Sequence, residues 1–308
     1  MASFDVTSTN TVTAVRADKF IPEIWSDEII AAYQKSLVMA PLVMKMNVKG
    51  KKGDVVHIPK PIRGSANVKA AASQVTIQSS VETEVLVSIN KHYEYSRFIE
   101  DIVDVQALGS LRQFYTSDAG YALARQIDTD LLSLGKSLGN GTGANFIHNR
   151  SFTFAAGGVT AYTGTNEAAF TDAGFRAAIQ LLDDADVPME NRYFVVPPVL
   201  KNSLLGTDRY VSDQFVGEGG SGGIRNGRIG NIYGVEVYVS TNIPQAQDAT
   251  DRAAMLFHKD AFVLAEQMAV RSQVQYKQEF LSTLFTADTL YGIQTVRTDA
   301  GVVLAVPA

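Results

Sequence analysis

Apolar residues recur along this chain with two periods, which separate helical from extended segments. Spacings of three and four predict a helix over about residues 23–38, ended by Pro41. The same spacing continues from Asp101 to Leu138, which predicts one long helix with Gly139 placed to end it and Gly109 as a point where it could break. A helix of about 30 residues is about 45 Å long, longer than a compact domain requires.

Alternation of apolar and polar residues predicts strands between these two helices. Residues 54–59 and 81–89 both alternate, and the stretch between them is polar and rich in Ala, Ser and Gln. The simplest interpretation is a long two-stranded arm. Because an isolated hairpin is only marginally stable in water, we expect a neighbouring subunit to support it.

The second half of the chain combines two short helices with many strands. A helix capped by Thr171 or Asp172 is expected to end before Val187-Pro188, and Pro197-Pro198 is expected to open another that runs to Leu205. The expected strands are Ser151–Phe154 within an otherwise loop-like region 139–170, then Tyr193–Val196, Met255–Phe257, Phe262–Ala265, Val270–Tyr276, Ile293–Val296 and Val302–Val306. A strand pair with a tight turn at Ile232-Tyr233-Gly234 lies between the two groups.

The composition describes a globular protein with a real core. Of 308 residues, 46% are hydrophobic and 19% charged, and the net charge is −5. There are no cysteines, which excludes disulfides, thiolate nucleophiles and cysteine-based zinc sites. Residues 1–17 are expected to form a polar, mobile arm, and they have no signal-peptide pattern. No apolar run is long enough to cross a membrane. We therefore expect a protein that is made in the cytoplasm and has no membrane partner.

Positive charge is concentrated at the start of the expected arm. Between Pro41 and Ala70 the chain has seven basic residues and one acid, Asp54, although the whole protein is negative. The basic residues are Lys45, Lys49, Lys51, Lys52, Lys60, Arg63 and Lys69. The net charge of −5 nevertheless gives no reason to expect tight binding of the whole chain to nucleic acid.

Three stretches resemble one known family. They are FIPEIWSDEIIAAYQKSLVMAPLV at 20–43, GRIGNIYGVEVYVSTNIP at 227–244, and the tail from Met255 through YGIQTVRTDAGVVLAV at 291–306. Together with the order of the elements, they resemble the major capsid proteins of tailed bacteriophages, which share the Hong Kong 97 fold. The subgroup that they resemble most is that of short-tailed phages.

The resemblance implies an α+β subunit in four parts. These are an N-terminal arm and helix (1–46), an extended hairpin arm or E-loop (47–92), a peripheral domain with a spine helix (93–170 and 261–308) and an axial domain (171–260). It also implies self-assembly through pentamers and hexamers into an icosahedral shell around double-stranded DNA, in the virion. The implied partners are further copies, a separate scaffolding protein and a portal, with weak non-specific DNA contact and neither cofactor nor enzymatic activity.

On this interpretation the candidate residues for contacts between subunits are basic or aromatic. They are Lys49, Lys51, Lys52, Lys60, Arg63, Lys69 and Trp25. The acidic candidates to receive them are Glu82, Glu84, Glu100, Asp101 and Asp104, or the cluster Asp183, Asp184 and Asp186. The alternative is that the lysines only keep an exposed hairpin edge soluble. Some members of this fold crosslink Lys to Asn, but no motif here selects a lysine for that reaction.

Two other functions stay open. One is an encapsulin, a nanocompartment of the same fold, whose shells carry a protein cargo instead of a genome. The other is an α/β enzyme that uses the glycine-rich loop 217–223, which contains both G-x-G-x-x-G and G-x-S-x-G. Both motifs need a helix directly afterwards, and the residues that follow Gly223 have no helical period. The four histidines show no metal-binding spacing.

Overall fold

The computed structural model describes most of the chain beyond its N-terminal segment. The described residues are 37–60, 64–75, 77, 82–101, 111–136, 138, 151–207, 210, 230–246 and 250–308. Several expectations lie outside them: the helix over 23–38, the arm at 1–17, the glycine-rich loop 217–223, and the residues Trp25, Arg63, Asp104, Gly109 and Gly139.

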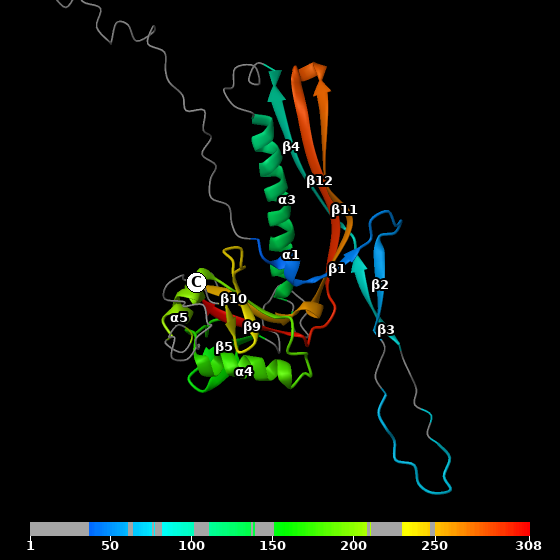
Figure 1. Ribbon diagram of the computed structural model, residues 1–308, viewed down its shortest axis with the longest axis vertical. Helices are drawn as coiled ribbons and strands as arrows, with labels where there is room; N and C mark the ends of the chain where they lie inside the picture. The colour runs from blue at the N-terminus through cyan, green and yellow to red at the C-terminus, as the bar shows by residue number, and fades with distance from the viewer. Residues whose placement is uncertain are drawn as a thin grey trace, which may run out of the picture.

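A long helix and a long sheet form one body of the subunit (Figure 1). Helix α3 (Leu111–Gly135) packs on one face of the sheet, with Ala119 and Leu123 buried against Phe285 and Ala287. In order across the sheet, its strands are β1 (Met44–Asn47), β11 (Phe262–Lys277), β12 (Ser282–Thr295) and β4 (Lys91–Glu100). The helix predicted to reach Leu138 ends at Gly135, where an added Cβ would collide with the sulfur of Met255.

The strands of this sheet are longer than the sequence predicts. Strand β11 continues through irregular pairing between Glu266 and Arg271, so the two expected strands are one. Strand β12 begins at Ser282, well before the expected Ile293, and β4 was not predicted at all. In β12 the cause is buried polar side chains, which break the apolar alternation: Asp288 accepts hydrogen bonds from Arg271 at 2.8 and 3.0 Å.

A seven-stranded sheet forms the second body, beside the lower end of α3 (Figure 1). In order across the sheet, its strands are β6 (Gly158–Ala161), β5 (Ser151–Ala155), β13 (Gly301–Pro307), β10 (Asp251–His258), β7 (Arg192–Val196), β9 (Val235–Val239) and β8 (Asn231–Ile232). Helices α4 (Asp172–Asp183) and α5 (Pro198–Leu205) cover its core, where Phe175, Leu200 and Phe194 are buried. The sheet joins β5, β6 and β13 to β7 and β10, across the expected domain boundaries at 170 and 260.

The local signals of this second body are confirmed. Thr171 caps α4, since its hydroxyl accepts from the backbone N–H of Gly174 at 3.2 Å. The strand pair turns at Tyr233 and Gly234, both with positive φ (50° and 83°). The Tyr233 hydroxyl donates to Asp172 Oδ1 at 2.8 Å, which ties this turn to the first turn of α4. Strand β6 was not predicted.

A buried carboxylate connects the two bodies. Asp128 of α3 is 1% exposed, and its Oδ1 accepts from the backbone N–H groups of Val38 (3.0 Å) and Met39 (2.9 Å). These groups open the short helix α1 (Met39–Leu42). Its Oδ2 accepts from the side-chain amide of Asn242 at 3.0 Å, in the segment between β9 and β10. Asp128 therefore fixes α3 to both the N-terminal segment and the second body.

Asp128→Ala should destabilise the subunit by at least about 2 kcal/mol, because two buried backbone donors and the part-buried amide of Asn242 lose their acceptor together. Chemical denaturation of purified subunits measures the change. Asp184→Ala is the matched control: this exposed residue follows α4, and its loss should change stability by less than about 0.5 kcal/mol. Equal effects of the two substitutions would contradict a structural role for Asp128.

Candidate assembly surfaces

The arm predicted from the sequence is confirmed as a hairpin. Strands β2 (Val55–Lys60) and β3 (Thr83–Ser88) pair in antiparallel register from Val55–Ser88 to Lys60–Thr83, and the arm projects away from both bodies (Figure 1). His57 Nδ1 lies 2.8 Å from Glu84 Oε2 across the pair. Two strands alone are marginal, so the arm depends on its root.

The root of the arm is packed against the four-stranded sheet. Val87 is fully buried with Val263 and Ala265 of β11. The backbone of β3 also passes so close to β12 that a Cβ added to Gly292 would collide with the carbonyl oxygen of Ser88. This contact requires glycine at position 292 and holds the hairpin where it leaves the body.

The basic candidates are spread along the arm and do not form one cluster. Lys49 lies at the root, with its Nζ 3.9 Å from Glu266 Oε2. Lys51 is held through its backbone, because its carbonyl accepts from Gln267 Nε2 at 2.9 Å. Lys52 and Lys60 are exposed, and Lys69 is exposed near the tip, where its Nζ lies 3.5 Å from the carbonyl of Ala70.

The structure places the acidic candidates in three different parts of the molecule. Glu82 and Glu84 lie on the arm itself. They were expected to contact the basic arm of another copy, but they belong to the same arm as the basic residues. Asp183 is engaged within its own body, 2.7 Å from the buried guanidinium of Arg192. Glu100 and Asp101 lie at the distal end of the four-stranded sheet, where Tyr276 donates to Asp101 at 2.7 Å. That distal end therefore carries exposed acidic side chains outside the arm, as Asp184 and Asp186 do on the second body.

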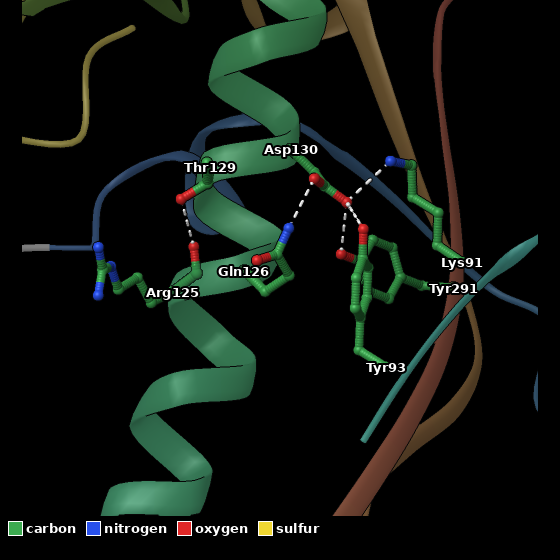
Figure 2. A network of polar contacts seen from close by, with 7 residues as sticks. All are labelled: Lys91, Tyr93, Arg125, Gln126, Thr129, Asp130 and Tyr291. Carbon is green, nitrogen blue, oxygen red and sulfur yellow. Dashed lines mark hydrogen bonds and ion pairs between the residues drawn. The ribbon is translucent and has the colours of Figure 1, made fainter. Parts of the chain in front are cut away.

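A second carboxylate of α3 holds the root of the arm. Figure 2 shows Asp130 at the centre of a polar network. Its Oδ2 accepts from Lys91 Nζ at 2.8 Å and from the hydroxyls of Tyr291 (2.8 Å) and Tyr93 (3.3 Å). Its Oδ1 accepts from Gln126 Nε2 at 2.9 Å. Lys91 directly follows the arm, so this network couples the arm to α3 and to β12.

Burial strengthens this network. The Asp130 side chain is 12% exposed. Burial and the hydrogen bond to Asp130 raise the pKa of Tyr291, so its hydroxyl stays protonated and donates. An open cleft of about 480 Å³ lies beside the network, and its lining residues are Ser88, Asn90, Lys91, Asp130, Ser133, Leu134, Ile293 and Gln294. Sequence reasoning missed this network, because only alternation of charged and aromatic residues in β4 hints at it.

The described ranges hold neither a metal-binding cluster nor a membrane-spanning helix. No group of three or more His, Asp or Glu side chains there could hold a metal ion. No helix in the same part of the chain is long and apolar enough to cross a membrane.

Asp130→Ala should loosen the root of the arm, because Lys91, Tyr93 and Tyr291 lose their shared acceptor. We expect amide hydrogen exchange across the end of β3 and the start of β4 to accelerate at least about tenfold, while exchange in α4 is unchanged. Asp118→Ala is the matched control, since Asp118 also lies on α3 but accepts from Tyr95 only, at 2.8 Å. Unchanged exchange around Lys91 in the first variant would contradict the coupling.

Comparison with known proteins gives one family and a set of solved capsids. The family model described as phage capsid protein matches residues 19–306. A solved chain from Mycobacterium phage Che8 is 26% identical, with a TM-score of 0.74 over 92% of this chain and 97% of that one. The capsid structure of the cyanophage P-SCSP1u is 18% identical, with a TM-score of 0.78 over 99% of each chain.

A third structure, the mature capsid of bacteriophage PhiM1, is 15% identical, with a TM-score of 0.71 over 93% of this chain and 92% of that one. The comparison with curated proteins gave no match. The matches span the arm, α3 and both sheets, and they confirm the expected capsid fold. The chain belongs to the phage capsid protein family, as a major capsid protein that forms the shell of the virion.

Proposed function

We propose that the subunit builds an icosahedral shell of pentamers and hexamers around double-stranded DNA, with the arm of each copy lying over its neighbour. One observation carries this proposal: the arm leaves the body, and within the part of the chain that the structure describes only its root is packed (Figure 1). Along it, apolar side chains are exposed to water at Val68, Val75 and Ile77. A hairpin of this kind gains stability only when another surface covers it.

We assign the two bodies to the two lobes of a capsid subunit. The seven-stranded sheet with α4 and α5 would be the axial lobe, at the centre of each ring, and α3 with the four-stranded sheet the peripheral lobe. Strand pairing supports a change in the expected boundaries, because residues 151–161 and 301–307 pair within the axial sheet. The assignment to the short-tailed subgroup stays a prediction.

Charge supports the placement of the arm over a neighbour. Lys52, Lys60 and Lys69 are exposed on the arm, and the opposite distal end of the subunit carries exposed Glu100. Complementary charge at such contacts selects the register and speeds association more than it increases affinity.

Other partners follow from this role. A separate scaffolding protein and a portal would guide assembly, and packaged DNA would meet the shell only weakly, since a subunit with net charge −5 releases few counterions. The role is structural and not enzymatic. The family match favours the phage shell over an encapsulin.

Electron microscopy with light scattering tests the proposal, on the chain expressed alone and with a candidate scaffolding protein. Closed shells, or rings of five and six subunits, are the expected result. A small monodisperse species under both conditions would overturn the proposal. Shells filled with a protein cargo would favour the encapsulin.

The double substitution Lys60→Glu and Lys69→Glu should raise the subunit concentration needed for assembly by at least about tenfold, because it reverses charge at two arm positions in every copy. Light scattering at rising concentration measures this threshold. Lys60→Arg with Lys69→Arg is the matched control at the same two positions, and it should leave the threshold nearly unchanged because both positive charges remain. If both pairs behave alike, the arm lysines act only through solubility.

A further inference from the structure

One edge of the four-stranded sheet has no partner strand among the described residues. Strand β4 pairs with β12 along ten residues on one side, and no described segment pairs with its other side. Helix α3 packs on the face of the sheet through Ala119 and Leu123, and so leaves that edge open. A long exposed edge presents a row of backbone donors and acceptors that can receive another strand.

The tip of the arm is a segment that belongs to no strand. Residues 64–75 and 77 form no helix or strand. The backbone N–H of Ser73 donates to the carbonyl of Ala70 at 3.4 Å, which closes a turn at Ala71 and Ala72. The side chains of Val68 and Ile77 are 101% and 90% exposed. Residues 66–70, before this turn, therefore have no partner strand among the described residues, and their valine lies in solvent.

The tip cannot reach the edge of its own subunit. Strands β2 and β3 hold it away from the body, and it extends in the direction opposite to the distal end of β4 (Figure 1). A second copy can present that edge. Each copy then offers one tip and one edge on different surfaces, which is the arrangement of a head-to-tail contact that closes into a ring.

The side chains along β4 suit this tip. Tyr95 faces α3, where its hydroxyl meets Asp118, so the alternate residues Glu94, Ser96 and Phe98 point to the other face of the sheet. Phe98 is 56% exposed there and offers an apolar surface for a valine of the tip.

We propose that the arm tip of one copy adds to the free edge of β4 of a second copy as a fifth strand, with Val68 on the face of Phe98. This inference rests on the proposed function, in which the arm lies over a neighbour, and it names the surface that receives it. Main-chain hydrogen bonds would supply affinity, and the alternating side chains would set the register.

Disulfide trapping tests the proposal, and the absence of cysteines from the natural chain makes every crosslink attributable. Ser96→Cys is combined in turn with a cysteine substitution at each of the positions Ala66, Asn67, Val68, Lys69 and Ala70. Assembled shells are oxidised and separated on non-reducing gels. Because side chains of a strand alternate between faces, links should form at Ala66, Val68 or Ala70 at least about fivefold more than at Asn67 and Lys69.

Two control variants carry the cysteine of the body at a position other than Ser96. Arg125→Cys is exposed on α3 and Asn202→Cys is exposed on α5, and neither should link to the tip. Equal yields at all five tip positions, or stronger links to Arg125→Cys, would overturn strand addition. Normal shells without links to Ser96→Cys would also overturn strand addition, but they would agree with the proposed function. Failure of the parent chain to form shells would contradict the proposed function itself.

Discussion

The architecture depends on two carboxylates in the last turns of α3, Asp128 and Asp130. Asp128 accepts from the backbone at Val38 and Met39 and from the side chain of Asn242, in the second body. Asp130 accepts from Lys91 and two tyrosines at the root of the arm. One end of a single helix thus sets the positions of the N-terminal segment, the arm and both sheets. The carboxylates can be buried there because each of their oxygens accepts at least one hydrogen bond.

This arrangement matters for a shell subunit because its contacts are far from its core. The arm and the distal end of the four-stranded sheet project from the subunit in different directions (Figure 1). A small rotation at the root therefore displaces the arm tip by a much larger distance. Rigid fixation at α3 lets many copies repeat the same contact, which closed symmetry requires.

Local signals in the sequence predicted much of the fold. The Thr171 cap, the proline start of α5 at Pro198 and the turn at Tyr233 were all correct, because each depends on residues close in sequence. Most of β12 was missed, since buried polar groups such as Asp288 interrupt the alternation that marks a strand. Strand β4 was missed because most of its positions are polar, and Ile99 is its one buried residue. Asp128 could not be recognised either, because its backbone partners lie about 90 residues away along the chain.

The candidate surface was predicted in part. The sequence located the arm and its positive charge, but it could not show that the lysines are spread from the root to the tip, or that Glu84 belongs to the same hairpin. The open edge of β4 follows from strand order, which is a tertiary property.

The central claim, that α3 holds the arm rigidly at its root, can be tested by one distance. Spin labels are attached at Leu86→Cys on β3 and Arg125→Cys on α3, since the chain has no other cysteine. Pulsed electron–electron double resonance then measures the distance between the two labels in unassembled subunits. The account predicts a single narrow distribution of distances between the labels. A broad or bimodal distribution would show an arm that moves freely on the body and would contradict it.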